Sequence, residues 1–160
     1  MNFSSQSRVW LYLSSREFTE SEVQEVNEQL EKFCVQWTAH GANLLAHGEV
    51  LHQRFILLLT DETHAGASGC SIDKSVHFIQ EIERKYNTQL FNRLLVAFKD
   101  GENINVIQAN DVKKLLKEGR LNENTPVFNM LVQTKEQLDS NFILPLKESW
   151  LARFLETVNT

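Results

Sequence analysis

The chain has 160 residues, of which 42% are hydrophobic and 23% are charged. This balance is typical of a folded globular protein and excludes a disordered chain. The net charge of −5 comes from 16 Lys and Arg against 21 Asp and Glu. It argues against nucleic acid as a partner, because contacts with phosphates need clustered basic residues. The length suits a single domain, residues 1–160.

Neither a membrane span nor a secretory signal is expected. The longest apolar runs, such as residues 55–59, are far shorter than a transmembrane helix requires. The apolar run at residues 9–13 is too short for the core of a signal peptide. The two cysteines, Cys34 and Cys70, cannot form a disulfide framework. We therefore expect a reducing, cytoplasmic location.

The first element that the pattern predicts is a strand over residues 8–13, rich in aromatic and apolar side chains. Thr19 and Glu22 have the spacing of a capping box that opens a helix. The apolar residues that follow recur at alternating spacings of three and four, which indicates a helix face directed at a core. These residues are Val23, Val26, Leu30, Phe33 and Trp37. Gly41 is expected to end the helix.

A hairpin is predicted next, with strands over about 42–51 and 55–59 and a tight turn near His52 and Gln53. The second strand lacks polar alternation, so both of its faces should be covered. A second helix is expected from Ser71 to about Tyr86. Another strand follows at 94–98, and Asp100-Gly101 is typical of a hairpin turn into residues 104–107.

This order of elements predicts an α+β fold with a ferredoxin-like βαββαβ core over about residues 8–108 and one added strand. In that topology two helices cover one face of an antiparallel sheet, and the first and third strands are central. A C-terminal extension over about 109–160 should pack on the same core. It holds predicted helices over 110–118 and around 147–155, and the neighbourhoods of Phe128 and Trp150 are expected in the core.

The stretch from residue 65 to 73, Ala-Gly-Ala-Ser-Gly-Cys-Ser-Ile-Asp, predicts a turn that opens the second helix. Gly66 and Gly69 permit positive φ angles, and Ser71 is expected to be the N-cap. The first N–H groups of a helix point outward and suit an anion or a carbonyl oxygen. The candidate ligand-binding residues are Gly66, Ser68, Gly69, Ser71 and His77.

Cys70 lies in this stretch and is the candidate catalytic residue, because the positive end of a helix favours a thiolate. The N–H groups of Ser71 and Ile72 would then stabilise an oxyanion. The alternative is a small, buried and inert cysteine. His77 is seven residues further on, roughly 10 Å along a helix axis, and is too far to activate the thiol. Four other histidines could serve instead: His40, His47, His52 and His64.

Several well-known motifs are absent from the sequence. No two glycines have the spacing of a phosphate-binding P-loop, and no Cys-x-x-Cys pair suggests zinc. Asp61, Glu62 and His64 carry donors that hard metals accept, although such residues are also common in solvated loops. We expect no metal site, and the cofactor stays open.

Three segments resemble a family of small proteins of uncharacterised function from Bacteroidetes. They are Trp37-x-Ala39-His40-Gly41, then residues 68–77 from Ser68 to His77, and residues 127–135 around Val127-Phe128-Asn129 and Thr134-Lys135. The resemblance spans nearly the whole chain, and the cysteine segment is its most specific part. Members of the family often carry the label "ABC transporter ATPase". The chain has neither the P-loop nor the Leu-Ser-Gly-Gly-Gln signature of such ATPases.

Two functions from different classes follow from these observations. The first is a non-catalytic binding or regulatory module, with a small anionic ligand or a protein partner at residues 66–73. The alternative is a thiol-dependent enzyme or redox sensor that uses Cys70. An ATPase is a third reading. Exposed sheet edges in this fold pair readily between subunits, so a homodimer is also compatible with the sequence.

Overall fold

The computed structural model describes residues 2–158, which form two compact units. Unit 1 comprises the chain up to Phe91 together with Val132–Asp139, and unit 2 comprises Asn92–Leu131 and the chain from Ser140 onward. Helices and antiparallel strands occur in both units, so the predicted α+β class is confirmed. The expected single domain stays a prediction.

The sheet of unit 1 has three antiparallel strands in the order β1-β5-β4. They are β1 (Arg8–Leu13), β4 (Leu45–Leu51) and β5 (Phe55–Asp61). All seven residues of β5 are buried, as the absence of polar alternation predicted. β5 is therefore the centre of unit 1, and its two faces belong to two apolar clusters.

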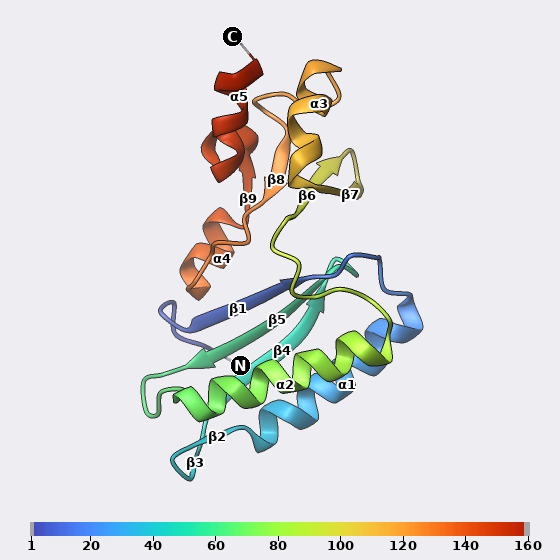
Figure 1. Ribbon diagram of the computed structural model, residues 1–160. Coiled ribbons are helices and arrows are strands. Elements are labelled where there is room, and N and C mark those ends of the chain that lie inside the picture. The colour runs from blue at the N-terminus through green and yellow to red at the C-terminus, as the bar shows by residue number, and fades with distance from the viewer. Residues whose placement is uncertain (1, 159–160) are drawn as a thin grey trace. The chain divides into compact units, whose positions relative to one another are not determined.

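Two long helices, α1 (Glu20–Gln36) and α2 (Gly69–Lys85), lie against one face of this sheet (Figure 1). The predicted capping box of α1 is confirmed, because Thr19 and Glu22 exchange their two hydrogen bonds at 3.1 and 3.0 Å. Arg16 also donates two hydrogen bonds to Glu22, at 2.8 and 2.7 Å. These bonds from Arg16, followed by the Thr19 amide, lower the pKa of Glu22 to about 2.

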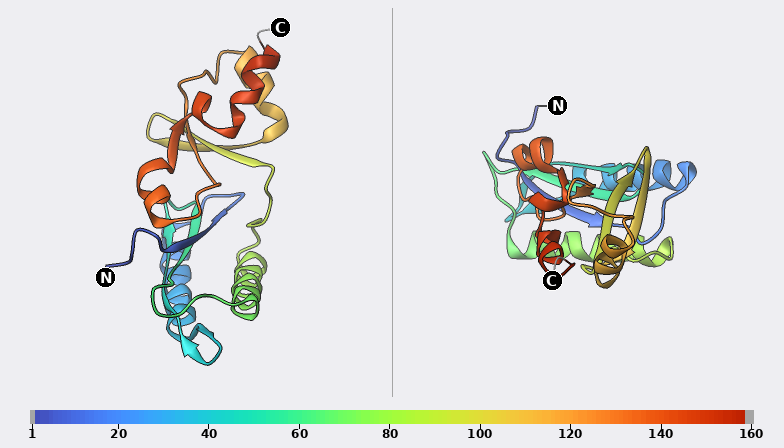
Figure 2. Two further views of the ribbon diagram at one scale, coloured as in Figure 1. Left: turned by 90° about the vertical axis from the view of Figure 1, so that its left-hand side faces the viewer. Right: turned by 90° about the horizontal axis from the view of Figure 1, so that it is seen from above.

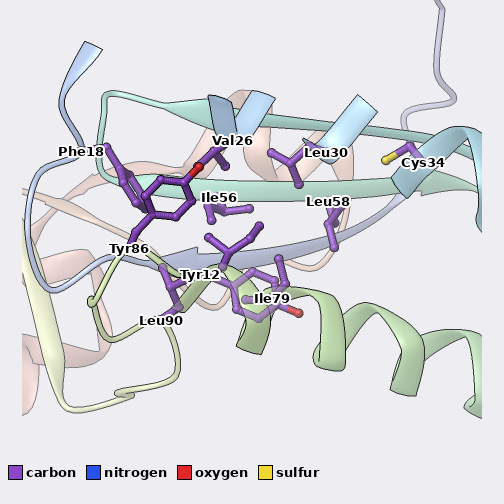
Figure 3. Packing of buried hydrophobic residues seen from close by; sticks show 11 residues of the cluster. Tyr12, Phe18, Val26, Leu30, Cys34, Ile56, Leu58, Ile79, Tyr86 and Leu90 are labelled. Carbon is purple, nitrogen blue, oxygen red and sulfur yellow. The ribbon is translucent and has the colours of Figure 1, made fainter. Parts of the chain in front are cut away.

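Side chains from both helices and from β1 and β5 converge in the main core of unit 1 (Figure 3). The members that α1 and α2 contribute are spaced by three or four residues, which gives each helix one apolar face. The residues involved are Val26, Leu30 and Cys34 from α1, Ile79 and Ile82 from α2, and Tyr12, Ile56 and Leu58 from the strands.

Helix α1 approaches the edge strand β4 closely because Gly48 has no side chain. A Cβ atom at this position would lie 3.1 Å from the Leu30 Cβ and 3.2 Å from the Leu58 Cδ2. Further along β4, the Asn27 side chain accepts a hydrogen bond of 2.8 Å from the Val50 amide. Helix α1 thus covers part of a strand edge that would otherwise be open.

The prediction that Gly41 ends α1 is wrong. Helix α1 ends at Gln36, with Trp37 as its C-cap. Gly41 instead forms, with His40, the two-residue turn between β2 (Thr38–Ala39) and β3 (Ala42–Asn43). The φ angles of His40 and Gly41 are 52° and 79°, as a type I′ hairpin turn requires.

The outer edge of β1 is paired at its two ends by segments far apart in sequence. At the start of β1, the Val9 amide donates to the Gln133 carbonyl at 3.0 Å and the Lys135 amide donates to the Ser7 carbonyl at 2.9 Å. Beyond the other end, the Ser15 amide donates to the Gln89 carbonyl at 2.9 Å. Between these contacts, the Leu11 backbone has no partner on this edge among residues 2–158.

The expected fourth strand of a ferredoxin-like sheet does not pair with β1. The segment predicted for that position forms β6 (Leu95–Asp100), which belongs to the sheet of unit 2. The ferredoxin-like topology is therefore not confirmed. The predicted hairpin from β6 into β7 (Asn103–Gln108) is confirmed, and its turn contains Gly101 with φ 63°.

Unit 2 has a four-stranded sheet in the order β7-β6-β8-β9, where β8 is Pro126–Phe128 and β9 is Ile143–Pro145. Helices α3 (Val112–Lys117) and α5 (Arg153–Val158) lie next to each other in unit 2 (Figures 1 and 2). The core of this unit joins β6, β8 and α3 through Val96, Phe98, Val112, Leu115 and Val127, and Phe154 and Leu155 of α5 pack against it.

The helix predicted around residues 147–155 is interrupted. The chain forms two short 3-10 turns, Leu146–Glu148 and Trp150–Ala152, before α5 begins. Ser149 separates the turns with an extended backbone, and its side chain accepts a hydrogen bond from the Leu151 amide at 3.1 Å. Trp150 is consequently 38% exposed and not a core residue, whereas Phe128 is buried as expected.

We predict that Gly48→Val lowers the free energy of unfolding by roughly 1–3 kcal/mol, because the new side chain overpacks the contact between β4 and Leu30. Chemical denaturation of the purified variant measures this change. Glu49→Val is the matched control, since residue 49 is half-buried on the same strand and its side chain leaves on the opposite face. Equal stabilities of the two variants would contradict the close approach.

Candidate functional site

The start of α2 is fixed by two serines that cap it reciprocally. The Ser71 amide donates to the Ser68 Oγ at 3.1 Å, and the Ser68 amide donates to the Ser71 Oγ at 2.6 Å. The N-cap is therefore Ser68 and not Ser71, and α2 begins at Gly69. Ser71 is only 1% exposed, so its side chain holds the helix start and does not face a ligand. With Ser71 as the N-cap, Asp73 would lie in the first turn of the helix, but with Ser68 as the N-cap it lies beyond that turn.

The two glycines of this stretch do not have the left-handed conformation that was expected. Positive φ angles among the glycines occur at Gly41, Gly101 and Gly119. Gly69 is the first residue of α2, and a Cβ atom built on it would meet no atom within 4 Å. A Cβ atom on Gly66 would meet only the Glu62 carboxyl group, at 3.7 Å. Gly69 therefore leaves open space beside the helix start.

A buried tryptophan ties this helix start to the end of α1. The Trp37 Nε1 donates a hydrogen bond of 2.8 Å to the Ser71 carbonyl, and Trp37 is 2% exposed. Its ring contacts Trp10 and Phe33, with ring centroids 5.7 and 5.1 Å away. The same cluster includes Ala39 and Leu44, with Ala65 and Ala67 from the loop before α2 packed against it.

Sequence reasoning assigned Trp37 only to a helix face and missed this role. A signal was present, because a buried indole N–H needs an acceptor and Trp37 comes at the end of the predicted helix. The hairpin β2–β3 and the first turn of α2 lie at the same end of unit 1 (Figure 1). The segments around Trp37 and around Cys70, which are 33 residues apart in the sequence, therefore meet in space.

Two backbone N–H groups at the start of α2 are available to a ligand. The Ser71 amide donates a hydrogen bond to the Ser68 Oγ, and the Ile72 amide donates one to the Ser68 carbonyl at 2.9 Å. The amides of Gly69 and Cys70 have no hydrogen-bond partner among residues 2–158. Unpaired N–H groups at a helix start carry partial positive charge, so this pair can bind an anion or a carbonyl oxygen.

The loop before α2 already holds a carboxylate of its own. The Glu62 Oε1 accepts a hydrogen bond of 3.1 Å from the Ala67 amide, and the Arg8 Nη1 lies 3.8 Å from the same oxygen. The Arg8 guanidinium also lies 4.8 Å from the centroid of the Trp10 ring. A backbone amide and a guanidinium therefore face the same anion beside the Trp37 cluster.

The two cysteines lie in opposite environments. Cys70 is exposed in the first turn of α2, whereas Cys34 is buried in the core of unit 1. Burial raises the pKa of Cys34 to about 12. The alternative of a buried, inert residue therefore applies to Cys34 and not to Cys70. No side chain among residues 2–158 forms a hydrogen bond with the Cys70 sulfur.

In the described part of the chain, no histidine forms a hydrogen bond with Cys70. His77 is exposed on α2, two turns after the cysteine. His47 lies on β4 near Glu49, with 3.6 Å between the Nε2 and the Oε1. The remaining histidines occupy turns and loops: His40, His52 and His64.

Within residues 2–158, no group of three or more His, Cys, Asp or Glu side chains could hold a metal ion. Asp61 instead organises its own loop, because its carboxylate accepts hydrogen bonds from the Ser4 and Thr63 amides at 3.1 and 3.0 Å. The Thr63 side chain, and then these amides, lower the pKa of Asp61. Over the same residues, no helix is both long enough and apolar enough to cross a bilayer.

Comparison of the chain with protein-family models, with curated proteins and with solved structures finds no match.

We predict that a thiol-alkylating reagent labels Cys70 in the folded protein, while Cys34 reacts only after unfolding. Cys70 is exposed and Cys34 is 7% exposed, and burial suppresses the thiolate of Cys34. Mass spectrometry of the native and the denatured protein measures both sites, with Cys70→Ser and Cys34→Ser as controls. Labelling of Cys34 at the rate of Cys70 in the native protein would contradict the packing of α1.

Proposed function

We propose that the chain is a non-catalytic binding or regulatory module, and that the start of α2 receives a small anionic ligand or a carboxylate of a protein partner. The observation that carries the proposal is the pair of unpaired N–H groups at Gly69 and Cys70. They lie beside open space at the positive end of a 17-residue helix.

Rigidity supports this proposal, because a site that is ordered before binding loses little entropy when the ligand arrives. The Trp37–Ser71 hydrogen bond and the Ser68–Ser71 capping box hold the first turn of α2. Ser68 and Ser71 are thus positioning residues in the proposed site, and the Gly69 and Cys70 amides are its donors. Gly66 lies in the loop before the helix. His77 is two turns further along α2, so it would contact a ligand only if that ligand also extended along the helix.

The Glu62 contact supports an anionic ligand over a neutral one. This carboxylate accepts a hydrogen bond from the Ala67 amide and lies near Arg8, so the loop already presents a backbone N–H group and a guanidinium to a carboxylate. Arg8 and Glu62 are both partly exposed, at 46% and 35% of their side-chain surfaces. A ligand carboxylate or phosphate can therefore compete for the same cation without unfolding the loop.

We predict that inorganic phosphate and acetate shift the amide NMR signals of Gly69 and Cys70 in the wild-type protein. Gly69→Pro removes the residue 69 signal and should abolish the response of the Cys70 signal, because proline has no N–H yet is well tolerated at the first position of a helix. The extended backbone of Ser68, with φ −95° and ψ 169°, suits a residue before proline. Gly69→Ala keeps the N–H group and is the matched control.

The binding proposal fails if neither anion shifts these two signals at millimolar concentrations. It also fails if the Cys70 signal responds equally in Gly69→Pro and Gly69→Ala, because the N–H group of residue 69 would then have no part in binding. Far-UV circular dichroism of both variants shows whether α2 still forms.

A thiol-dependent enzyme or redox sensor is the second candidate, and the exposure of Cys70 favours it. The oxyanion donors expected at Ser71 and Ile72 are used within the helix start, so the donors in this proposal become Gly69 and Cys70. The pH dependence of Cys70 labelling separates the two candidates. A labelling rate that reaches half its maximum at the same pH as in an unstructured cysteine peptide, or above it, would remove the thiol mechanism.

Three broader expectations also stay proposals. A cytoplasmic location and a homodimer through a sheet edge accord with the composition and with the free part of the β1 edge. The family resemblance also implies an ATPase. This hypothesis requires that the pure protein binds a nucleotide, and absence of such binding would contradict it.

We also propose that unit 1 is a ferredoxin-like module whose fourth strand is divided. Residues 89–91 and 132–135 both lie along the outer edge of β1, where that topology places its fourth strand. Gln89 bonds to Ser15, and the Phe91 ring contacts Tyr12 with centroids 5.3 Å apart. Gln133 bonds to Val9. Both stretches run antiparallel to β1, and residues 92–131 are inserted between them.

The register gives this proposal a sharp test. A continuous strand from Gln89 to Gln133 needs five residues between them, because their partners Ser15 and Val9 are six positions apart. The chain supplies residues 90, 91 and 132, so about two residues should replace residues 92–131.

We predict that a chain with residues 92–131 replaced by Thr-Val, and ending at Asp139, folds as a monomer with one cooperative unfolding transition. Residues 1–91 alone are the control and should be less stable, because they lack the pairing of Ser7 and Val9 with residues 133–135. Chemical denaturation compares the two. An unfolded shortened chain, or one no more stable than residues 1–91, would contradict the divided strand.

A further inference from the structure

The segment Val132–Asp139, here called the strap, belongs to unit 1, while the chain on both sides of it belongs to unit 2. It crosses to β1 and forms three backbone hydrogen bonds there. The Val9 amide donates to Gln133, and the Lys135 and Glu136 amides donate to Ser7 and Ser5, at 2.8 to 3.0 Å. Among residues 2–158, the one ladder contact between the strap and β1 is an isolated bridge between Arg8 and Thr134.

Few buried groups anchor the strap. Val132 is 5% exposed and packs with Val9, Leu57 and Leu59, and Leu138 joins this cluster half-buried. The helix α4 (Lys135–Asn141) that begins in the strap has no buried residue. Its side-chain contacts, Gln6 with Glu136 and Lys135 with Asp139, are exposed. Such contacts contribute little to stability in water.

The opposite edge of β1 is held very differently. All six residues of β1 pair with β5, every residue of which is buried. Regions with few buried apolar contacts and exposed hydrogen bonds open at a lower free energy than the core they pack on. The strap therefore has the properties of a segment that can leave β1 while the β1-β5-β4 sheet and its two helices stay folded.

We propose that the strap is a latch on the first sheet. When docked, it covers Val9, Leu57 and Leu59 and pairs the start of the β1 edge. When released, it uncovers these side chains and leaves the backbone of this edge unpaired from Ser5 to Leu13. Both ends of the strap continue into unit 2. The latch does not depend on an anion site at α2.

Hydrogen exchange in the full-length protein tests the latch directly. The Val9, Lys135 and Glu136 amides each donate across the contact between the strap and the N-terminal segment, so they should share one protection factor, which is the intrinsic exchange rate of an amide divided by its observed rate. That protection factor should be at least roughly tenfold smaller than the protection factor of the Leu58 amide in β5, the equivalent of about one hydrogen bond. Equal protection factors for Val9 and Leu58 would overturn the proposal.

Lys135→Pro removes one strap hydrogen bond without breaking α4. Thr134 caps this helix, since its Oγ1 and its carbonyl accept from the Gln137 and Leu138 amides, so residue 135 is the first helical position and tolerates proline. Lys135→Ala is the matched control, because it loses the same contact with Asp139 but keeps its N–H. Val9 exchange should rise roughly tenfold in the proline variant only, with Leu58 exchange unchanged. Equal acceleration of exchange at the Val9 and Leu58 amides would show that the strap unfolds together with the core, and would contradict the latch.

Discussion

The hydrogen bond from the Trp37 indole to the Ser71 carbonyl is the contact on which the arrangement of the candidate site depends. It joins the end of one helix to the beginning of the next, inside a cluster that also holds Trp10 and Phe33. Breaking it would leave a buried N–H group without an acceptor, which costs more than the bond itself contributes. This bond therefore fixes the orientation of the first turn of α2, and with it the direction of the unpaired Gly69 and Cys70 amides.

The sequence predicted correctly those elements that depend only on residues close together in the chain. The capping box of Thr19 and Glu22 and the uninterrupted apolar run of β5 both appear as expected, because side-chain spacing alone determines them. The start of α2 was misplaced because Ser68 and Ser71 are equally good N-caps. Their spacing of three lets each bond to the other, and the sequence does not distinguish the cap from its partner.

Features that depend on distant partners could not be predicted in this way. The residues of β6 have the composition of a strand in either sheet, and its pairing with β8 joins Phe98 to Val127. Likewise, Cys34 and Cys70 are the same residue type near helix ends, yet one faces the core and the other faces solvent. The unpaired amides of Gly69 and Cys70 lie within the predicted stretch, but on the residues before the expected cap and not after it.

The strap also has a consequence for how the protein is made. The three strands of the β1-β5-β4 sheet and both long helices of unit 1 lie before residue 92 and are synthesised first, but the residues that cover Val9 and pair with Ser7 come more than 40 positions after residue 91. Throughout that interval of translation, the nascent first unit carries an unfinished edge and an uncovered apolar surface. An unpaired strand edge beside uncovered apolar side chains is prone to pair with other chains, so the order of synthesis lengthens the time during which the first unit is open to aggregation.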